Sequence, residues 1–162
     1  MLSDDAYAIS GAQDTLVAVW QGEPSADRVN VLADHLRLWA KRNAGRVYLY
    51  NVITATTKLP SAQTRAAMQV QFTSMRGQLQ GMAIVLEKTG VEGSLARAML
   101  TTVFTVTRQP FPMRVFALRR DALTWLTRQG CLATADALTG VADTLTQRLR
   151  AQHHSESLPS EV

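Results

Sequence analysis

The sequence contains only one cysteine, Cys131, so no disulfide can form within the chain. A lone thiol is ordinary in proteins of reducing compartments, which favours a cytoplasmic location. No apolar run approaches the roughly 20 residues that a membrane-spanning helix requires. The first ten residues include Asp4 and Asp5 and lack both the basic and the apolar region of a signal peptide. We therefore expect neither a membrane span nor a secretion signal.

Catalytic and metal-binding motifs are also missing. The sequence contains no Cys-x-x-Cys, His-Glu-x-x-His, Gly-x-Ser-x-Gly or Gly-x-Gly-x-x-Gly segment. His35 has no accompanying cysteine or carboxylate motif, so we expect it at the boundary of a core rather than in catalysis. The pair His153–His154 lacks further ligands at the spacing that zinc requires. The sequence therefore predicts no enzyme, no metal site and no cofactor.

Lysine is scarce among the basic residues, which number 17 against 13 acidic ones and give a net charge of +4. Arginine makes bidentate contacts to phosphate, so nucleic-acid binding has to be considered. The segment 97–128 holds one acid, Asp121, and the arginines 97, 108, 114, 119, 120 and 128. Few aromatic side chains accompany them to stack on bases. We consider three functions, namely protein interaction, binding of a small apolar ligand and nucleic-acid binding. The last of these therefore has the least support.

Segments with strand and helix patterns alternate along the 162 residues, of which 46% are hydrophobic. This pattern predicts one α/β domain over residues 1–150, with right-handed parallel crossovers. We expect a mixed, mainly parallel five-stranded sheet that begins with an antiparallel hairpin and is packed by four to five helices. The expected strands are 7–9, 15–21, 46–53, 82–86 and 113–116, and the expected helices are 25–43, 61–80, 94–107, 121–129 and 134–150.

Two of these helices leave an alternative open. The segment 101–107 is rich in β-branched residues, so it could form a strand instead of a helix. The helix 134–150 carries an apolar stripe that consists of Leu138, Val141, Leu145 and Leu149. This stripe could pack on the sheet or against a second copy of the chain. Residues 151–162 have the composition of a disordered tail.

The stretch 46–61 is the first candidate for a functional site. It is a strand that leads into a threonine-rich loop and then into a helix for which Ser61 is the expected N-cap. The carboxyl ends of central strands are where α/β proteins usually bind ligands. The loop 87–93 follows the next strand and would lie beside the first loop. The candidate site residues are therefore Thr54, Thr56, Thr57, Lys58, Ser61, Thr89, Gly90 and Gly93.

Two interpretations of these hydroxyl groups stay open. They could form a site for an anion, a phosphate or a partner, or carry a phosphate themselves, next to the positive end of a helix dipole. Alternatively, they only satisfy the hydrogen bonds of the loop and the helix cap.

Methionines suggest a second kind of site. Their flexible side chains usually fill gaps in a core, but they can also line an adaptable pocket. The pocket would accept a small apolar or lipid-like ligand, and the candidates are Met68, Met75, Met82, Met99 and Met113.

Two short segments resemble a known family. They are Met82–Leu86, and Met113–Phe116 followed by Asp121–Leu126. Together with the order of elements over residues 15–129, they are similar to the STAS domains (sulfate transporter and anti-sigma factor antagonist), in particular to the SpoIIAA-like branch. The resemblance implies a small cytoplasmic module without a cofactor that binds other proteins.

In the anti-sigma antagonists of this family, a kinase phosphorylates a serine at the start of the second helix. Residues 54–58 of this chain offer threonines in that region but no Asp-Ser pair. We therefore do not transfer the phosphorylation site of these antagonists to this chain. We expect a non-catalytic protein-interaction or regulatory module that binds another protein or forms a homodimer, with the small apolar ligand as the alternative.

Overall fold

The computed structural model describes residues 2–3, 6–54, 60–106 and 110–156 as a layered α/β structure. The predicted fold class, with its N-terminal hairpin and mainly parallel sheet, is confirmed. The sheet has six strands because two residues, Leu2–Ser3, pair with the hairpin. The strands are β1 (Leu2–Ser3), β2 (Tyr7–Ala12), β3 (Thr15–Trp20), β4 (Val47–Ile53), β5 (Leu79–Leu86) and β6 (Met113–Phe116). The helices are α1 (Ala26–Arg42), α2 (Ala62–Ser74), α3 (Gly90–Val106), α4 (Arg119–Arg128) and α5 (Ala135–Glu156).

The strands lie in the sheet in the same order as in the sequence, from β1 to β6. The pairs β1–β2 and β2–β3 are antiparallel, whereas β3, β4, β5 and β6 run parallel. Ile53 pairs with Leu86, so β4 and β5 end at the same level. The starting points of the two loops that follow these strands are therefore neighbours.

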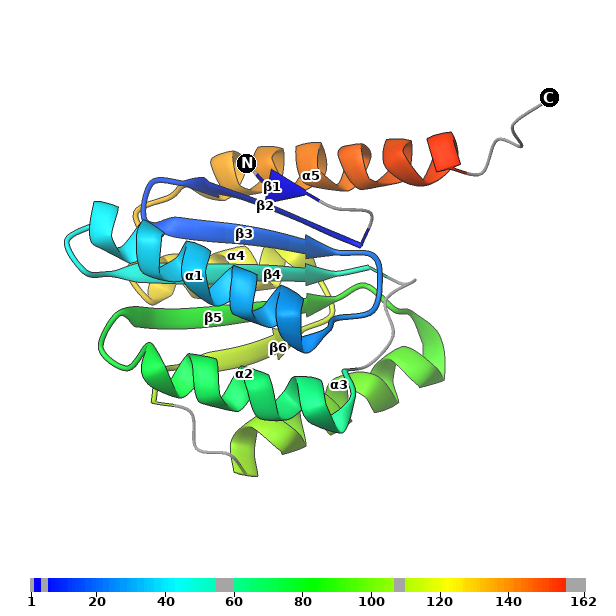
Figure 1. Ribbon diagram of the computed structural model, residues 1–162, viewed down its shortest axis with the longest axis horizontal. Helices are drawn as coiled ribbons and strands as arrows, with labels where there is room; N and C mark the ends of the chain where they lie inside the picture. Colours follow the sequence, from blue (N-terminus) through cyan, green and yellow to red (C-terminus); the bar gives the residue numbers. More distant parts are fainter. Residues whose placement is uncertain (1, 4–5, 55–59, 107–109, 157–162) are drawn as a thin grey trace.

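Helices cover both faces of the sheet (Figure 1). Because consecutive parallel strands are neighbours, right-handed crossovers place α1, α2 and α3 on one face. The core on this face includes Leu36 of α1 and Phe72 of α2, and a smaller cluster joins Leu100 of α3 to the sheet. Helices α4 and α5 cover the opposite face, where Leu126 and Leu145 are fully buried.

Strand β4 is buried on both faces, which is typical of a central parallel strand. Tyr48 and Tyr50 point towards α4 and α5, and Val47 and Leu49 point towards α1 and α2. All four side chains are at most 1% exposed. Because side chains alternate along the strand, each residue of β4 points to a defined face of the sheet.

Serine caps begin the first two helices, and the one at Ser61 was predicted. The Oγ of Ser25 accepts a hydrogen bond from the backbone N–H of Arg28 at 3.3 Å. The Oγ of Ser61 accepts from the N–H of Thr64 at 3.2 Å. Such caps typically contribute about 1 kcal/mol each.

The boundaries of α2 and β5 differ from the prediction. Helix α2 ends at Ser74 instead of about residue 80, and β5 begins at Leu79 instead of Met82. Gly77 has a φ of +81°, a left-handed conformation that ends a helix at low cost. Leu79 therefore belongs to the strand and not to the helix that was expected over residues 61–80.

The start of α3 also differs from the prediction. Helix α3 begins at Gly90, so Ser94 lies inside the helix and is not its N-cap. The helix continues to Val106, which decides against the strand alternative for residues 101–106. Residue 107 lies outside the described residues.

Helix α5 packs on the chain's own sheet and extends further than predicted. Leu138, Leu145 and Leu149 are buried against β2 and β3, so the stripe covers the sheet of the same chain. The helix continues to Glu156. The prediction of a disordered tail is therefore wrong for residues 151–156, and residues 157–162 lie outside the described part of the chain. Among the helices so described, none has the length and apolar character needed to cross a membrane.

Candidate functional site

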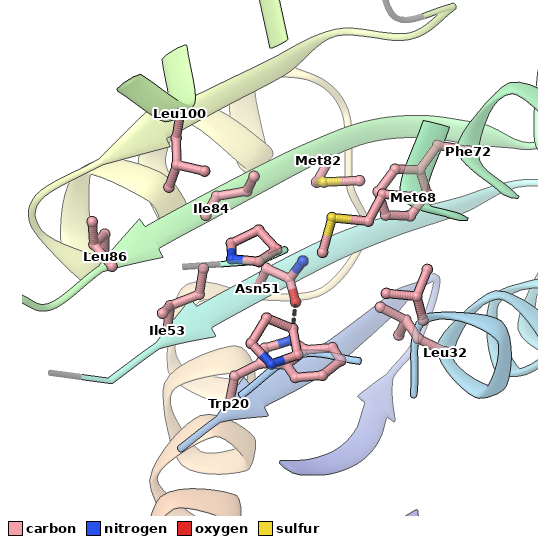
Figure 2. A pocket seen from close by; sticks show the side chains of 13 residues that line it. Trp20, Leu32, Asn51, Ile53, Met68, Phe72, Met82, Ile84, Leu86 and Leu100 are labelled. Atoms are coloured by element: carbon pink, nitrogen blue, oxygen red, sulfur yellow. Dashed lines mark hydrogen bonds between the residues drawn. The ribbon is translucent and has the colours of Figure 1, made fainter. Parts of the chain in front are cut away.

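An apolar cavity of about 50 Å³ lies between the sheet and the helices α1, α2 and α3 (Figure 2). It is partly open and reaches the carboxyl ends of β4 and β5. Among the described residues that line it, none is charged. The lining residues are Trp20, Pro24, Val29, Leu32, Asn51, Ile53, Pro60, Met68, Phe72, Met82, Ile84, Leu86 and Leu100.

Strand alternation selects the side chains that form the floor of the cavity. Asn51 and Ile53 of β4 point to the same face as Val47 and Leu49 because side chains two residues apart share a face. The helices supply the walls. Pro24 and Pro60 immediately precede the serine caps of α1 and α2, so the starts of these helices also border the cavity.

Of the predicted site residues after β4, the structure describes Thr54 and Ser61, and neither of them lines the cavity. The backbone N–H of Thr54 donates to the carbonyl of Trp20 at 3.0 Å. Thr56, Thr57 and Lys58 lie outside the described residues. Ser61 caps α2, and its hydroxyl also contacts that of Thr64 at 3.0 Å.

The predicted site residues after β5 belong to the start of α3. Thr89 is exposed and directly precedes the helix, and Gly90 is its first residue with a φ of +72°. Gly93 is buried in the first turn against the backbone of Lys88. Gly93 thus has a packing role.

The structure brings together the starting points of the two predicted loops but not all of the predicted residues that it describes. The N–H of Glu87 donates to the carbonyl of Ile53 at 2.9 Å, so both loops start from the same place. Ser61 instead lies near the start of α1, because the Thr64 hydroxyl donates to the carbonyl of Pro24 at 3.2 Å. The cavity is lined by Ile53 and Pro60, which directly precede the predicted residues Thr54 and Ser61, and by Leu86, three positions before Thr89.

The hydrogen bonds of Ser61 favour the interpretation that its hydroxyl only satisfies the helix cap, over a role in binding or carrying a phosphate. Its oxygen accepts from the first turn of α2 and contacts Thr64, which is itself only 3% exposed. Ser61 therefore acts as a helix cap.

The methionines divide into two groups. Met68 and Met82 line the cavity, as the pocket interpretation requires. Met75 is fully buried in the core beneath α1 and α2, and Met113 is partly buried against the same core. The side chain of Met99 lies outside the described residues.

Sequence reasoning missed Asn51, the polar side chain in the cavity wall. It is 8% exposed, and its Oδ1 accepts a hydrogen bond from Nε1 of Trp20 at 2.8 Å. The available signal was an amide side chain inside an otherwise apolar and aromatic strand. Such a residue must find partners when it is buried, so it marks a position of interest.

An ion cluster lies on the opposite face, also at the carboxyl end of β5. Arg119 donates to Glu87 at 2.6 Å and to Asp143 at 2.7 Å, which joins α4 to the end of β5 and to α5. Burial lowers the pKa of Arg119, but the hydrogen bond and charge of Glu87 outweigh it and raise the pKa above its ordinary value. Burial also raises the pKa of Tyr50, with the charge of Arg119 acting in the opposite direction. Arg119 therefore stays charged and Tyr50 neutral near neutral pH.

The hydroxyl of Tyr50 has no hydrogen-bond partner among the residues that the structure describes, although it is buried. Tyr50→Phe is therefore expected to raise the free energy of unfolding by about 1 kcal/mol, because it removes an unsatisfied buried group. The matched control is Tyr48→Phe, since the Tyr48 hydroxyl donates to the carbonyl of Gln129 at 2.7 Å. That control should lower the free energy of unfolding by about 1 kcal/mol. Urea denaturation measures both, and equal losses in the two variants would contradict the prediction.

The other potentially reactive side chains, Cys131 and His35, make contacts within the fold. Cys131 is buried, and burial raises the pKa of its thiol, as is typical of unreactive cysteines. The Nδ1 of His35 lies 2.9 Å from the carbonyl of Val31 one turn earlier. Within the described ranges, no group of three or more His, Cys, Asp and Glu side chains could hold a metal ion.

Comparison with known proteins adds no assignment to this geometry. No protein-family model matches the sequence, and no curated protein matches it either. The candidate function must therefore be argued from the cavity and the surfaces around it.

Proposed function

We propose that this protein is a non-catalytic binding protein whose cavity receives the apolar part of a small ligand. The observation that carries the proposal is the unfilled apolar space at the carboxyl ends of β4 and β5. At about 24 cal/mol per Å³, a void of about 50 Å³ lowers stability by about 1 kcal/mol. An apolar group that fills the void restores this stability, whereas water gains few hydrogen bonds there.

The size of the cavity limits what it can hold. An apolar cavity of about 150 Å³ accepts a benzene molecule, and this one measures about 50 Å³. It therefore fits a short alkyl segment or a branched methyl group, with the rest of the ligand at the opening. The flexible side chains of Met68 and Met82 would allow the space to enlarge.

A filled cavity should no longer bind an apolar probe. Ile84 is 3% exposed and lines the cavity, so Ile84→Phe is expected to weaken binding of pentane at least tenfold. The methyl resonances of Met68 and Met82 in a titration followed by NMR report the binding. Val70→Phe is the matched control, because Val70 is 67% exposed on α2 and should leave the affinity unchanged.

Two results would overturn this proposal. One is the absence of saturable pentane binding to the wild-type protein at any concentration that water allows. The other is equal binding to the wild-type protein and a folded Ile84→Phe variant, since pentane would then occupy another place.

A protein-interaction or regulatory module, the function first expected from the sequence, is the second candidate. The specific observation is an apolar surface at the start of α3, where Val91 is 86% and Leu95 is 62% exposed. The two side chains lie one helical turn apart and so face the same direction. Exposed apolar surfaces of this kind often contact proteins. The resemblance to STAS domains and a cytoplasmic location belong to this candidate, with another protein or a second copy of the chain as partner.

Native mass spectrometry of the protein purified from its own host separates the two candidates. A bound small molecule would support the cavity as the functional site. A bare dimer or a co-purified protein would support the α3 surface instead.

Nucleic-acid binding receives less support from the arginines than their number suggested. Arg97 donates to the carbonyls of Leu86 and Lys88, at 3.4 and 2.8 Å. Arg119 is held by its two carboxylate partners. These two guanidinium groups are committed to contacts within the chain, so they do not present a phosphate-binding face.

A further inference from the structure

The amide of Asn51 has a fixed orientation inside the cavity wall. The indole Nε1–H of Trp20 can only donate a hydrogen bond, so the Asn51 oxygen must face it. The observed contact, Nε1 to Oδ1 at 2.8 Å, agrees with this requirement. Figure 2 shows the Asn51 amide among the apolar side chains, with its oxygen directed to Trp20. The Nδ2 atom occupies the other arm of the planar amide and therefore faces away from the indole.

That nitrogen is a donor for which the described part of the chain supplies no acceptor. Asn51 is 8% exposed and lines the cavity. Its Oδ1 accepts from Trp20, whereas no hydrogen bond of Nδ2 is found among the described residues. Nδ2 is not one of the fully enclosed atoms without a partner, which include the Tyr50 hydroxyl, so it keeps some accessible surface. A largely buried N–H group without an acceptor is unfavourable. The cavity thus offers one donor in otherwise apolar surroundings.

The lining also determines the charge of a group that could meet this donor. No side chain among the described lining residues carries a charge. An ionised carboxylate or phosphate placed there would be desolvated with no counter-ion among these lining residues, which is strongly unfavourable. A neutral oxygen has no such penalty and still accepts a hydrogen bond.

We propose that the ligand is a small neutral molecule with an apolar body and one hydrogen-bond acceptor, such as a ketone, ester or ether oxygen, that binds to Nδ2 of Asn51. This inference rests on the proposed function, because it assumes that the cavity is the binding site. The Trp20–Asn51 hydrogen bond holds the donor in place before the ligand arrives, so little conformational entropy is lost on binding. Trp20 and Asn51 act together as the polar end of an apolar site.

Matched probes of similar size test the role of the donor. Diethyl ketone carries a carbonyl that pentane lacks, and both have the same number of carbon atoms. We expect Asn51→Leu to weaken diethyl ketone binding about tenfold, the value of one hydrogen bond to a buried donor. Pentane binding should be unchanged or tighter, because the variant replaces a polar wall with an apolar one. For each probe, the effect is the ratio of the affinities of the Asn51→Leu variant and the wild-type protein. The hydration of the free probe is the same in both affinities, so it does not affect this ratio.

The same substitution at an exposed position provides the control. Asn30 lies on α1, where its Oδ1 accepts from Gln71 at 2.7 Å in an exposed contact. Asn30→Leu should change the affinity for neither probe. A tenfold loss in this variant as well would overturn the inference, since the effect would then not come from the cavity.

A second measurement uses only the wild-type protein, in case Asn51→Leu fails to fold. The side-chain amide resonances of Asn51 should shift on addition of diethyl ketone and stay in place with pentane. An unshifted Asn51 amide in the ketone complex would overturn the inference. An ordered water on Nδ2 that persists with diethyl ketone bound would also overturn it.

The outcomes separate this inference from the proposed function. If both probes bind and Asn51→Leu affects them equally, the cavity is a binding site without polar selectivity, and only the inference fails. If neither probe binds to the wild-type protein, the proposed function fails as well.

Discussion

Asp14→Ala is expected to lower the free energy of unfolding by about 3 kcal/mol, because a buried and charged acceptor would be lost. Asp14 lies in the turn between β2 and β3 and is 6% exposed. Its two carboxylate oxygens accept from the backbone N–H of Leu132, at 2.9 and 3.1 Å, and Thr15 donates to one of them at 3.2 Å. The substitution would leave the N–H of Leu132 without this partner. Urea denaturation monitored by circular dichroism measures the loss.

Asp14→Asn is the matched variant for this prediction. It retains a carbonyl oxygen of the same size but removes the charge, and charge-assisted hydrogen bonds are roughly twice as strong as neutral ones. We expect it to lose about half as much stability as Asp14→Ala. If both variants lost less than about 1 kcal/mol, the loss typical of exposed carboxylates, the contact between Asp14 and the backbone of Leu132 would not be important for the fold.

Gly93→Ala is expected to lower the free energy of unfolding by about 3 kcal/mol, the upper end of the range for overpacking. A Cβ atom at this position would lie 1.9 Å from the carbonyl oxygen of Lys88 and 2.5 Å from its carbon. These are backbone atoms, so no side-chain rotation relieves the overlap. The same carbonyl accepts from Arg97 at 2.8 Å, and that bond would be disturbed when the backbone moves. Thermal unfolding and urea denaturation measure the effect.

Gly140→Ala is the control for Gly93→Ala. Gly140 lies within α5, and a Cβ atom there would meet nothing within 4 Å. Alanine favours a helix over glycine, so this variant should gain about 0.5–1 kcal/mol. The two glycines of one chain should therefore respond with opposite signs. Similar effects of both substitutions would show that the first turn of α3 adjusts without cost.

Patterns of neighbouring residues were enough to predict most of the fold. Ser25 and Ser61 have the hydroxyl that caps a helix, and the alternation of Tyr48 with Leu49 marks a strand covered on both faces. The errors occurred where a local pattern allowed two structures. Leu79 continued the helical spacing of Phe72 and Met75, but it begins β5 after the turn at Gly77.

The candidate site was predicted only in part, for a physical reason. The order of the elements was enough to place the carboxyl ends of two neighbouring parallel strands together, and Ile53 indeed pairs with Leu86. The cavity itself depends on side chains from several strands and helices that meet only in the folded chain. The pairing of Trp20 with Asn51 joins two strands that are adjacent only after folding. No local spacing encodes such a contact.

Helix α5 (Ala135–Glu156) lies far along the chain from the β2–β3 hairpin, yet it covers one face of that hairpin. Val17 and Val19 of β3 share a buried cluster with Leu145 and Leu149. Synthesis runs from β2 towards α5, so the apolar face of the hairpin has no cover from α5 until the described elements between them have been made. The hairpin therefore depends on a distant helix for its shielding, and a chain interrupted before α5 presents this face to whatever apolar surface is near.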